Sequence, residues 1–553
     1  MPSATMHQAD SPEAKKALAT RQQLVRIRAA VRTLYFWWLT PAALILGVLL
    51  RTREWLHDKS LWLDEISITL YLTQRGYRGL LGPLGDQGGP VGWLWAERTA
   101  INVFGVSELS LRLVPWFASL VALVIFPAVA KRLAGPIATP AATVLFATSP
   151  ALIYYAAETK QYSSDTACAL LALLVTTQLV SRVPNLRSCL LWGLACGALA
   201  WLSQPAVLVV AACALWVIAY RARDRLTWMP ILAGCAVLGL ILGAEWFLTL
   251  RQLAANEGLA RYWQGFGGYP PASAGLVGDV GWLGRTADKF AWQMGHFAVS
   301  GLFVALALWG LATTFRLRPW PALLVLLVLL AAVGAAVTRH YPLAHRLALY
   351  LLPVLIILLT VPLDLAARYH RWGPAGRWRP IAVAGTVVAL LITTGPTVST
   401  GIGKLANPDD VTSGRQALAF VASRREHSDV VLADRWASRT FEFYGPREHV
   451  RADGLVAMDA VRNRICDRKP LAPIAGATRV WLVLAHHPSN EPANRDEIYE
   501  SQFAARATLV ASYRGAGDAA AYLFDLTKPP RSPSPPLASW VGNGCFTVRL
   551  GPI

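Results

Sequence analysis

Eleven predominantly apolar stretches fill the first 400 residues of this 553-residue chain. A helix needs about 20 such residues to cross the hydrocarbon layer of a membrane. The pattern therefore predicts a polytopic α-helical membrane protein with about 11 transmembrane helices. We expect these helices at 34–50, 113–130, 136–155, 165–181, 188–202, 205–220, 229–250, 294–313, 320–337, 347–364 and 381–398.

The basic residues of the connecting segments fall on alternate sides of this series. With the N-terminus in the cytoplasm, the inner segments carry 19 basic residues against three acidic ones. Because basic residues accumulate in cytoplasmic loops, this predicts a cytoplasmic N-terminus, an uncleaved first apolar stretch and an extracytoplasmic C-terminal region. The basic residues are Lys15, Lys16, Arg21, Arg26, Arg28, Arg32, Lys131, Arg132, Arg182, Arg187, Arg221, Arg223, Arg225, Arg316, Arg318, Arg368, Arg371, Arg377 and Arg379.

Composition agrees with this view of the chain. Hydrophobic residues make up 54% of it, which is too apolar for an ordinary soluble protein. The formal net charge of +19 comes mostly from the inner loops. Since these charges are scattered and not gathered on one face, no nucleic-acid partner is expected. We expect an integral protein of the bacterial plasma membrane, in contact with membrane lipids.

Three regions are expected along the chain. Residues 1–33 form a basic cytoplasmic tail, and 34–398 form the transmembrane domain, with large outer loops at 51–112 and 251–293. From 399 to 553 the pattern changes to short apolar runs typical of strands, which predicts a small extracytoplasmic α/β domain. The predicted elements are strands at 429–433, 478–484, 507–512 and 520–526 and a helix at 415–424. An extracytoplasmic location permits a disulfide between Cys466 and Cys545.

Two adjacent acids, Asp64 and Glu65, stand in an apolar and aromatic run just after the first span. A carboxylate that is partly removed from water suits general-base chemistry. Two solvated loop acids, one of them a helix cap, would give the same sequence.

A second motif follows the third span, from Tyr154 to Asp165, and combines Glu158, Lys160 and Tyr162. A lysine here can hold a phosphate as a point charge. Interfacial anchoring is the alternative, because Tyr and Lys also belong at headgroup depth.

A third motif, from Arg339 to Arg346, is basic although it lies on the outer side, where basic clusters are uncommon. An anionic ligand or acids of the outer domain would each account for it. The chain contains no GxxxxGK[ST] loop and no GxGxxG after a strand, so nucleotide-driven chemistry is not expected.

Four segments, in order, resemble GT-C glycosyltransferases of the protein O-mannosyltransferase and aminoarabinose (lipid A) transferase type. The resemblance covers about residues 34–365. The chain has Gly89-Pro90 where the family often has two prolines, and Lys160 where it usually has Arg; both departures leave the donor and any metal site open. The segments are Trp62-Leu-Asp64-Glu65, Asp86-Gln-Gly-Gly-Pro90 with Phe104–Arg112, Tyr155–Tyr162, and Tyr341–Arg346 closing on Pro353.

This resemblance implies inverting transfer of a sugar from a polyprenyl-phosphate donor to an extracytoplasmic acceptor, which is a protein, a lipid or a cell-envelope glycan. Asp64 would be the general base, and Glu65 would orient it or help to bind a divalent metal ion. The leaving phosphate would be held by Lys160, Tyr162, Arg346 and Arg112, with support from Glu158, Asp86, His340 and Tyr341.

Two other classes of function remain open at this stage. A lipid or lipid-linked-sugar flippase would place ionisable residues near the bilayer midplane and show paired repeats. A non-catalytic membrane scaffold would tolerate the loss of Asp64. The sequence favours the transferase because most acids lie at one surface and no internal repeat is found.

Overall fold

A computed structural model describes most of the chain in two compact units. Unit one comprises Met1–Glu54, Gly89–Trp93 and Val114–Asn407, and unit two comprises Trp55–Gly88, Leu94–Leu113 and Pro408–Ile553. The described residues are 38–85, 87–271, 275–368, 379–459, 474, 476–487, 495–504, 507–517, 519–528 and 545–550.

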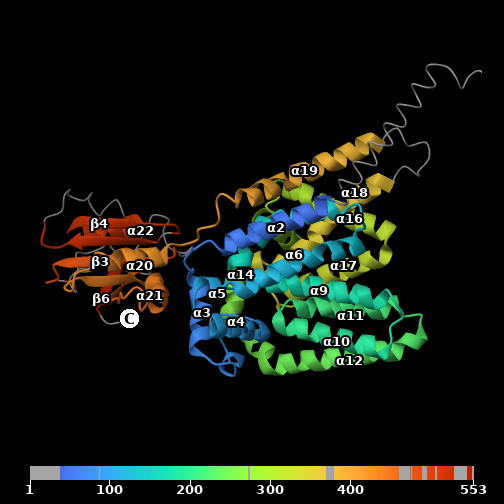
Figure 1. The fold of residues 1–553 in the computed structure, drawn as a ribbon, viewed down its shortest axis with the longest axis horizontal. Coiled ribbons are helices and arrows are strands. Elements are labelled where there is room, and N and C mark those ends of the chain that lie inside the picture. Colours follow the sequence, from blue (N-terminus) through green and yellow to red (C-terminus); the bar gives the residue numbers. More distant parts are fainter. Residues whose placement is uncertain are drawn as a thin grey trace, which may run out of the picture. The chain divides into compact units, whose positions relative to one another are not determined.

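Unit one is helical throughout its described regular structure (Figure 1). Short 3-10 helices lie at η3 (Tyr155–Ala157), η4 (Arg225–Thr227) and η7 (His345–Leu351). Single π-helical turns lie at η5 (Trp246–Leu250) and η6 (Ala291–Gly295). The α-helices are α2 (Leu39–Trp55), α6 (Leu113–Leu133), α7 (Thr139–Thr148), α8 (Pro150–Tyr154), α9 (Tyr162–Val180), α10 (Leu186–Leu202), α11 (Ala206–Tyr220), α12 (Trp228–Glu245), α13 (Arg251–Ala254), α14 (Glu257–Gly265), α15 (Gly275–Phe290), α16 (Ser300–Leu317), α17 (Pro319–Val337), α18 (Leu352–Arg368) and α19 (Arg379–Gly403).

The predicted membrane class is confirmed, but the count of eleven spans is not. Among the described residues seven helices are long and apolar enough to cross a membrane, and a bent pair would make eight. Two further apolar helices, α10 and α11, have only 17 and 15 residues. At about 1.5 Å per residue they fall short of a hydrocarbon layer of about 30 Å. The seven are Leu113–Leu133, Tyr162–Val180, Arg225–Ala254, Ser300–Leu317, Pro319–Val337, His345–Leu365 and Ala384–Gly403.

The bent pair has a local cause. The axes of Thr139–Thr148 and Pro150–Ala157 meet at 54°. Proline disfavours helical backbone in the residue before it, and Ser149 accordingly has φ −60° and ψ 117°. The bend leads directly into the second motif.

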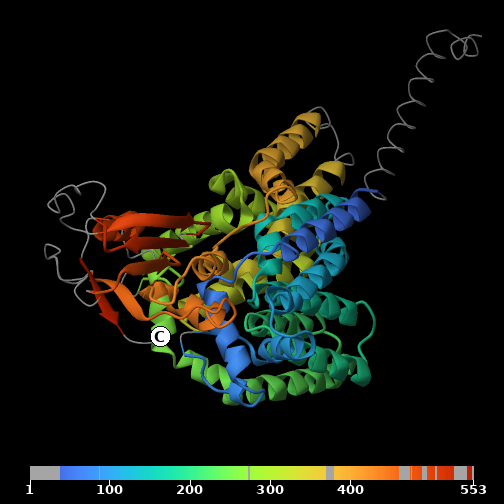
Figure 2. The ribbon, with the colours of Figure 1, turned by 60° about the vertical axis from the view of Figure 1, so that its left-hand side comes forward.

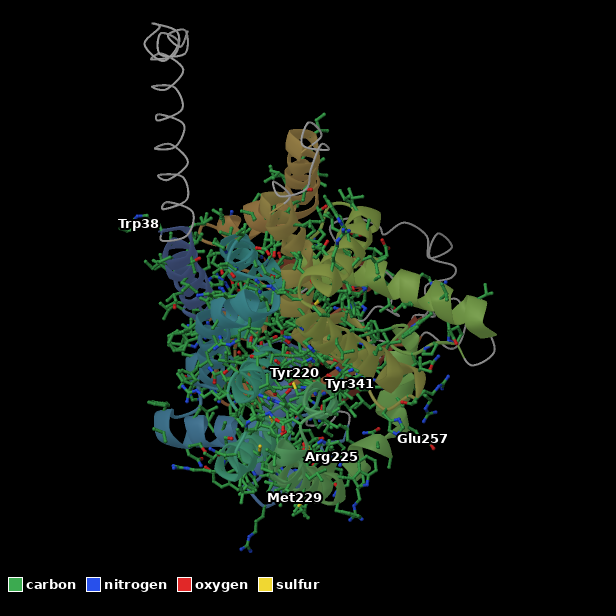
Figure 3. All side chains as sticks on the ribbon, turned by 90° about the vertical axis from the view of Figure 1, so that its right-hand side faces the viewer. Trp38, Tyr220, Arg225, Met229, Glu257 and Tyr341 are labelled. Atoms are coloured by element: carbon green, nitrogen blue, oxygen red, sulfur yellow. The ribbon has the colours of Figure 1, made fainter. Side chains whose placement is uncertain are left out.

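Close helix packing and an apolar exterior characterise unit one. Helix α10 packs on α12 where Gly193 lies against Gly234, and an added Cβ at Gly193 would stand 2.2 Å from the Gly234 carbonyl oxygen. Small residues permit such approaches between membrane helices. Large apolar side chains point outward instead, among them Trp38 at 67% exposure, which Figure 3 shows at the margin, whereas Tyr341 lies among the helices. A surface of this kind suits lipid.

Unit two contains a six-stranded mixed sheet in the order β4-β5-β3-β1-β2-β6 (Figures 1 and 2). Strand β1 pairs in parallel with β2 and β3, while β4, β5 and β6 run antiparallel to their neighbours. The strands are β1 (Val430–Asp434), β2 (Gly454–Asp459), β3 (Arg479–Leu484), β4 (Thr508–Arg514), β5 (Ala520–Asp525) and β6 (Cys545–Leu550).

Helices cover both faces of this sheet. Alternate residues of a strand point to opposite faces. Leu482 lies in one core with Tyr499 and Phe503 of α22 (Arg495–Ala504). Its neighbour Trp481 meets Phe420 of α20 (Gly414–Ala422), with ring centroids 5.9 Å apart. The predicted α/β character is confirmed.

Most of the segment 51–112, which the sequence pattern assigned to the transmembrane domain as its first outer loop, belongs to unit two. It carries α3 (Leu63–Gln74), η2 (Gly79–Leu81), most of α4 (Val91–Phe104) and α5 (Glu108–Leu111). The physical reason is a set of polar contacts to α20 and α21 (Ser438–Tyr444), which are described below.

Candidate functional site

The two adjacent acids lie in the first turn of α3. Trp62 precedes this helix in extended backbone, and its amide N–H donates to the Glu65 carboxylate at 3.3 Å. Carboxylates in a first turn are favoured by the N-terminal end of the helix dipole. Asp64 is half-buried and Glu65 is buried, so the two acids have different surroundings.

Glu65 forms a two-point ion pair with Arg112, and both side chains are buried. Arg112 Nε donates to one carboxylate oxygen at 2.9 Å and Nη2 donates to the other at 2.8 Å. Burial lowers the pKa of Arg112, but the charge and hydrogen bond of Glu65, together with Tyr444 and Glu108, outweigh burial and raise that pKa. The pair therefore stays charged, and two-point geometry of this kind is strong.

Arg112 also donates to the backbone carbonyls of Lys59 at 3.0 Å and Ser60 at 3.2 Å. One guanidinium thus holds both the segment before α3 and the acid next to Asp64. The sequence resemblance implies that Arg112 holds the leaving phosphate. In the structure its donors point to Glu65 and to backbone carbonyls.

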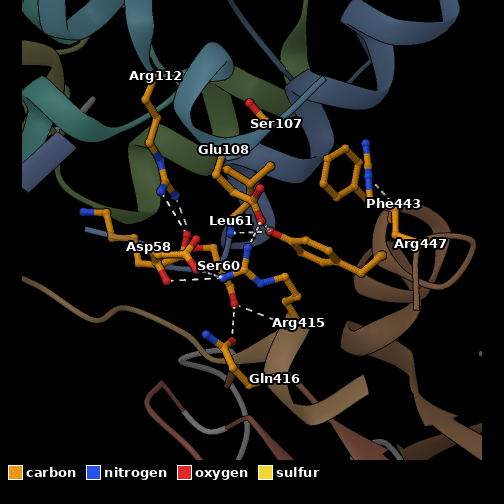
Figure 4. A network of polar contacts seen from close by, with 12 residues as sticks. Asp58, Ser60, Leu61, Ser107, Glu108, Arg112, Arg415, Gln416, Phe443 and Arg447 are labelled. Atoms are coloured by element: carbon orange, nitrogen blue, oxygen red, sulfur yellow. Dashed lines mark hydrogen bonds and ion pairs between the residues drawn. The ribbon is translucent and has the colours of Figure 1, made fainter. Parts of the chain in front are cut away.

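Further polar contacts tie the same segment to α20 and α21 (Figure 4). Arg415 donates to Glu108 at 2.8 Å and pairs with Asp58 at 2.7 Å. The Tyr444 hydroxyl donates to Glu108 at 3.0 Å and accepts from the Leu61 amide at 2.8 Å. The backbone just before Asp64 is therefore fixed from the C-terminal domain.

Glu97 of α4 is a buried acid that the sequence analysis missed. It has no exposed surface, and neither carboxylate oxygen has a hydrogen-bond partner among the described residues. Burial, and then the charge of Glu65, raise the pKa of Glu97 well above its ordinary value. A single acid inside an apolar helix was the only signal in the sequence.

Glu97→Gln is expected to stabilise the protein at neutral and alkaline pH. The raised pKa means that the unfolded chain loses the Glu97 proton first, so stability declines as pH rises above the ordinary glutamate pKa. Thermal unfolding in detergent between pH 4 and pH 9 should show a shallower decline for Glu97→Gln than for wild type. Equal slopes would contradict a neutral Glu97, and exposed Glu442→Gln is the control.

In unit one, the second motif is buried beside the bend that Pro150 causes. Glu158, Lys160 and Tyr162 are all less than 5% exposed. The Lys160 amide donates to the Glu158 carbonyl at 2.6 Å, which closes a tight turn before α9. The structure thus gathers these three predicted residues within the helical unit.

Arg346 contacts both this motif and the segment 251–293. Its guanidinium carbon lies 5.6 Å from the centroid of the Tyr162 ring and 5.8 Å from that of Trp263. Cations are attracted to aromatic faces at such distances. Arg346 and Tyr162 are therefore brought together, and Trp263 adds a second aromatic contact to Arg346.

An apolar pocket of about 150 Å³ lies next to Arg346 along the chain. Its few polar lining residues include Lys289 and His345. At His345 the backbone is left-handed, with φ 44°, which turns the chain between the pocket and Arg346. Apolar side chains of α15, α16, α17, η7 and α18 form the rest of the wall: Leu283, Phe290, Phe303, Leu329, Val333, Leu351 and Leu355 are among them.

The other predicted residues have different positions. Tyr341 is half-buried and donates to the Leu347 carbonyl at 3.3 Å. Burial, and then Asp165, raise the pKa of Tyr341 well above its ordinary value, so its phenol stays protonated. His340 is exposed and contacts Thr338 at 3.0 Å. Asp86, and Cys466 with its predicted disulfide to Cys545, lie outside the described residues.

The described residues do not fit a metal centre. They contain no group of three or more His, Cys, Asp and Glu side chains that could hold an ion. Glu65, which was expected to orient Asp64 or to help bind a metal, directs both oxygens to Arg112.

Sequence comparisons return no match: no family model matches the chain, and neither does any curated protein. Several solved structures are similar in fold. An oligosaccharyltransferase from Archaeoglobus fulgidus, in complex with Zn and sulfate, is 13% identical, with 80% of this chain and 68% of that chain covered and a TM-score of 0.47. ArnT from Cupriavidus metallidurans, in the apo state, is 13% identical, with 92% and 99% covered and a TM-score of 0.46.

The same ArnT bound to undecaprenyl phosphate gives a TM-score of 0.45 at 13% identity, with 88% of this chain and 97% of that chain covered. These are GT-C glycosyltransferases, the type of protein that the sequence motifs resemble. At these scores the likeness assigns no chemistry to the present chain.

Proposed function

We propose that this protein is a membrane glycosyltransferase that moves a sugar from a polyprenyl-phosphate donor to an acceptor outside the bacterial plasma membrane. The observation that carries the proposal is the apolar pocket with Lys289 and His345 in its lining and Arg346 beside it in the chain. An apolar pocket beside basic side chains suits a ligand with a long hydrocarbon part and an anionic head group. A polyprenyl phosphate has both.

The donor phosphate is assigned to Lys160 and Arg346, with Tyr162 as a hydrogen-bond donor. Phosphate gains negative charge when it leaves, and fixed cations stabilise that charge most where water is scarce. Lys160 and Tyr162 are buried and Arg346 is half-buried. Their charges and dipoles therefore act where little water screens them. Glu158 is assigned the positioning of Lys160.

Asp64 is assigned the role of general base. The acceptor hydroxyl oxygen attacks the anomeric carbon, its proton passes to the Asp64 carboxylate, and the bond from that carbon to the phosphate oxygen breaks. The electron pair of the broken bond leaves with the polyprenyl phosphate. Attack from the side opposite the leaving group inverts the anomeric centre.

Glu65 and Arg112 act through Asp64 and not on the substrates. Their ion pair fixes the first turn of α3, which keeps the half-buried carboxylate of Asp64 in place. Because both Glu65 oxygens accept from Arg112, Glu65 is not assigned to a metal ion in these steps.

Binding of the donor tests the proposal. The purified protein in nanodiscs is heated with a panel of polyprenyl-phosphate monosaccharides, and the unfolding midpoint is recorded. We expect one donor to stabilise the wild type, and we expect Arg346→Ala and Lys160→Ala each to weaken its binding by at least tenfold. A lost charge-assisted contact of about 1.5–3 kcal/mol accounts for that factor.

Arg261→Ala is the matched control, because Arg261 is exposed on the helix that carries Trp263. It should bind the donor as wild type does. If no lipid-linked sugar shifts the midpoint, or if Arg346→Ala binds normally, the proposed donor site is wrong. Donor binding without transfer to any acceptor would favour a flippase.

A further inference from the structure

Polar and aromatic residues also cluster at the carboxyl ends of β1 and β3 in unit two, apart from the contacts of Glu65 and Arg112. The connection after β1 leads to β2, on one side of β1, whereas β3 lies on the other side and its chain continues through α22 to the distant β4. The connections therefore diverge between β1 and β3. In open α/β sheets such a divergence at the carboxyl ends is where ligands bind.

Arg495 makes this edge rigid. It is wholly buried, and its Nη1 donates to the His486 carbonyl at 2.7 Å and to Asp434 at 3.4 Å. The Tyr499 hydroxyl donates to the other oxygen of Asp434 at 3.0 Å. Since Asp434 ends β1 and His486 follows β3, one guanidinium ties the two loops together.

His486 is held in left-handed backbone, with φ 60°. This conformation is uncommon for a residue other than glycine and persists where the surroundings impose it. Here Arg495 donates to the carbonyl of the same residue. The centroid of the His486 imidazole lies 6.3 Å from that of the Trp62 ring and 6.2 Å from that of the Trp436 ring.

We name Trp62, Trp436 and His486 the aromatic row. All three side chains are half-buried, so each keeps part of its surface exposed. Aromatic faces with polar edges suit a ligand that is apolar on one side and polar at its rim. A sugar ring has this character, because its C–H groups form a face and its hydroxyls surround it.

From this arrangement we infer that the aromatic row binds a saccharide, and that this saccharide is the acceptor of the transfer reaction. The second part rests on the proposed function. Trp62 stands two residues before Asp64, and the base must reach the acceptor hydroxyl.

Direct binding of soluble sugars tests the first part without any transfer reaction. Full-length protein in nanodiscs is titrated with di- and trisaccharides of mannose, galactose, glucose and arabinose, and binding is followed by saturation-transfer NMR. We expect at least one saccharide to bind the wild type. Trp436→Ala should weaken that binding at least tenfold, and Trp436→Phe should restore most of it.

Trp95→Ala is the matched control, because Trp95 is also a half-buried tryptophan of unit two but packs against Tyr77. It should bind the saccharide normally. Absence of saccharide binding in the wild type, or equal binding in Trp436→Ala, would overturn the inference.

Transfer assays separate this inference from the proposed function. With the acceptor identified, Trp436→Ala should raise KM for the acceptor at least tenfold and leave KM for the lipid donor unchanged. Saccharide binding without any transfer would support saccharide binding by the aromatic row and contradict the proposed glycosyltransferase function. Transfer to a peptide or lipid acceptor, with an unchanged KM for that acceptor in Trp436→Ala, would support the proposed glycosyltransferase function and contradict an acceptor site at the aromatic row.

Discussion

Asp64→Asn is expected to lower the rate of sugar transfer by about 10²–10⁴ while the protein still binds its lipid donor. The amide has nearly the size of the carboxylate, so the first turn of α3 should keep its geometry. It cannot accept the proton that the acceptor hydroxyl loses, which leaves the attacking oxygen a poor nucleophile.

Two measurements check this result on one preparation. Radiolabelled sugar transfer gives the rate, and the shift of the unfolding midpoint with donor gives binding. The control is Glu442→Gln, an equivalent loss of charge at an exposed acid of α21. Full activity of Asp64→Asn would show that another group is the base. Loss of donor binding would show that Asp64 also contributes to binding of the lipid donor before the reaction.

The membrane character was predictable because the bilayer imposes a simple rule. A helix that crosses hydrocarbon must be apolar over most of its length, so the membrane class is visible in the sequence even though the count of spans is not. The break at Ser149 was less visible. The prediction for 136–155 was one continuous helix, although Pro150 stands in its interior.

In the C-terminal domain, four strands and α20 were predicted and lie near the expected positions. Two strands were missed, and they pair with each other. β2 is a short run that starts at Gly454, and β6 reaches it from Cys545, far along the chain. β6 is an edge strand, and its partner β2 lies far away in the sequence. The local pattern of apolar residues therefore did not indicate this pair of strands.

The residues of the candidate site were predictable by type but not by partner. The sequence resemblance marked both Glu65 and Arg112, assigning Glu65 to the orientation of Asp64 or to a metal ion and Arg112 to the leaving phosphate. Their pairing depends on the fold, which joins positions 47 residues apart. The C-terminal domain likewise contributes Arg415 and Tyr444, and nothing in their local sequence connects them with Asp64.

Arg112→Ala is expected to have the largest effect on stability. Removing one member of a buried ion pair leaves the other charge uncompensated, at a cost of about 3–5 kcal/mol. Here the loss also frees the carbonyls of Lys59 and Ser60, which Arg112 holds. The segment before Asp64 should therefore become mobile, and unit two should unfold at a lower temperature than in wild type.

The test uses limited proteolysis and thermal unfolding of the full chain, with Arg112→Lys as the comparison. Lysine keeps the charge but cannot make the two-point contact, so it should restore only part of the stability. The double variant Glu65→Leu with Arg112→Met should be more stable than Arg112→Ala, since it leaves no charge unpaired. If Arg112→Ala unfolds as wild type does but loses donor binding, Arg112 acts on the phosphate, as the sequence resemblance implied.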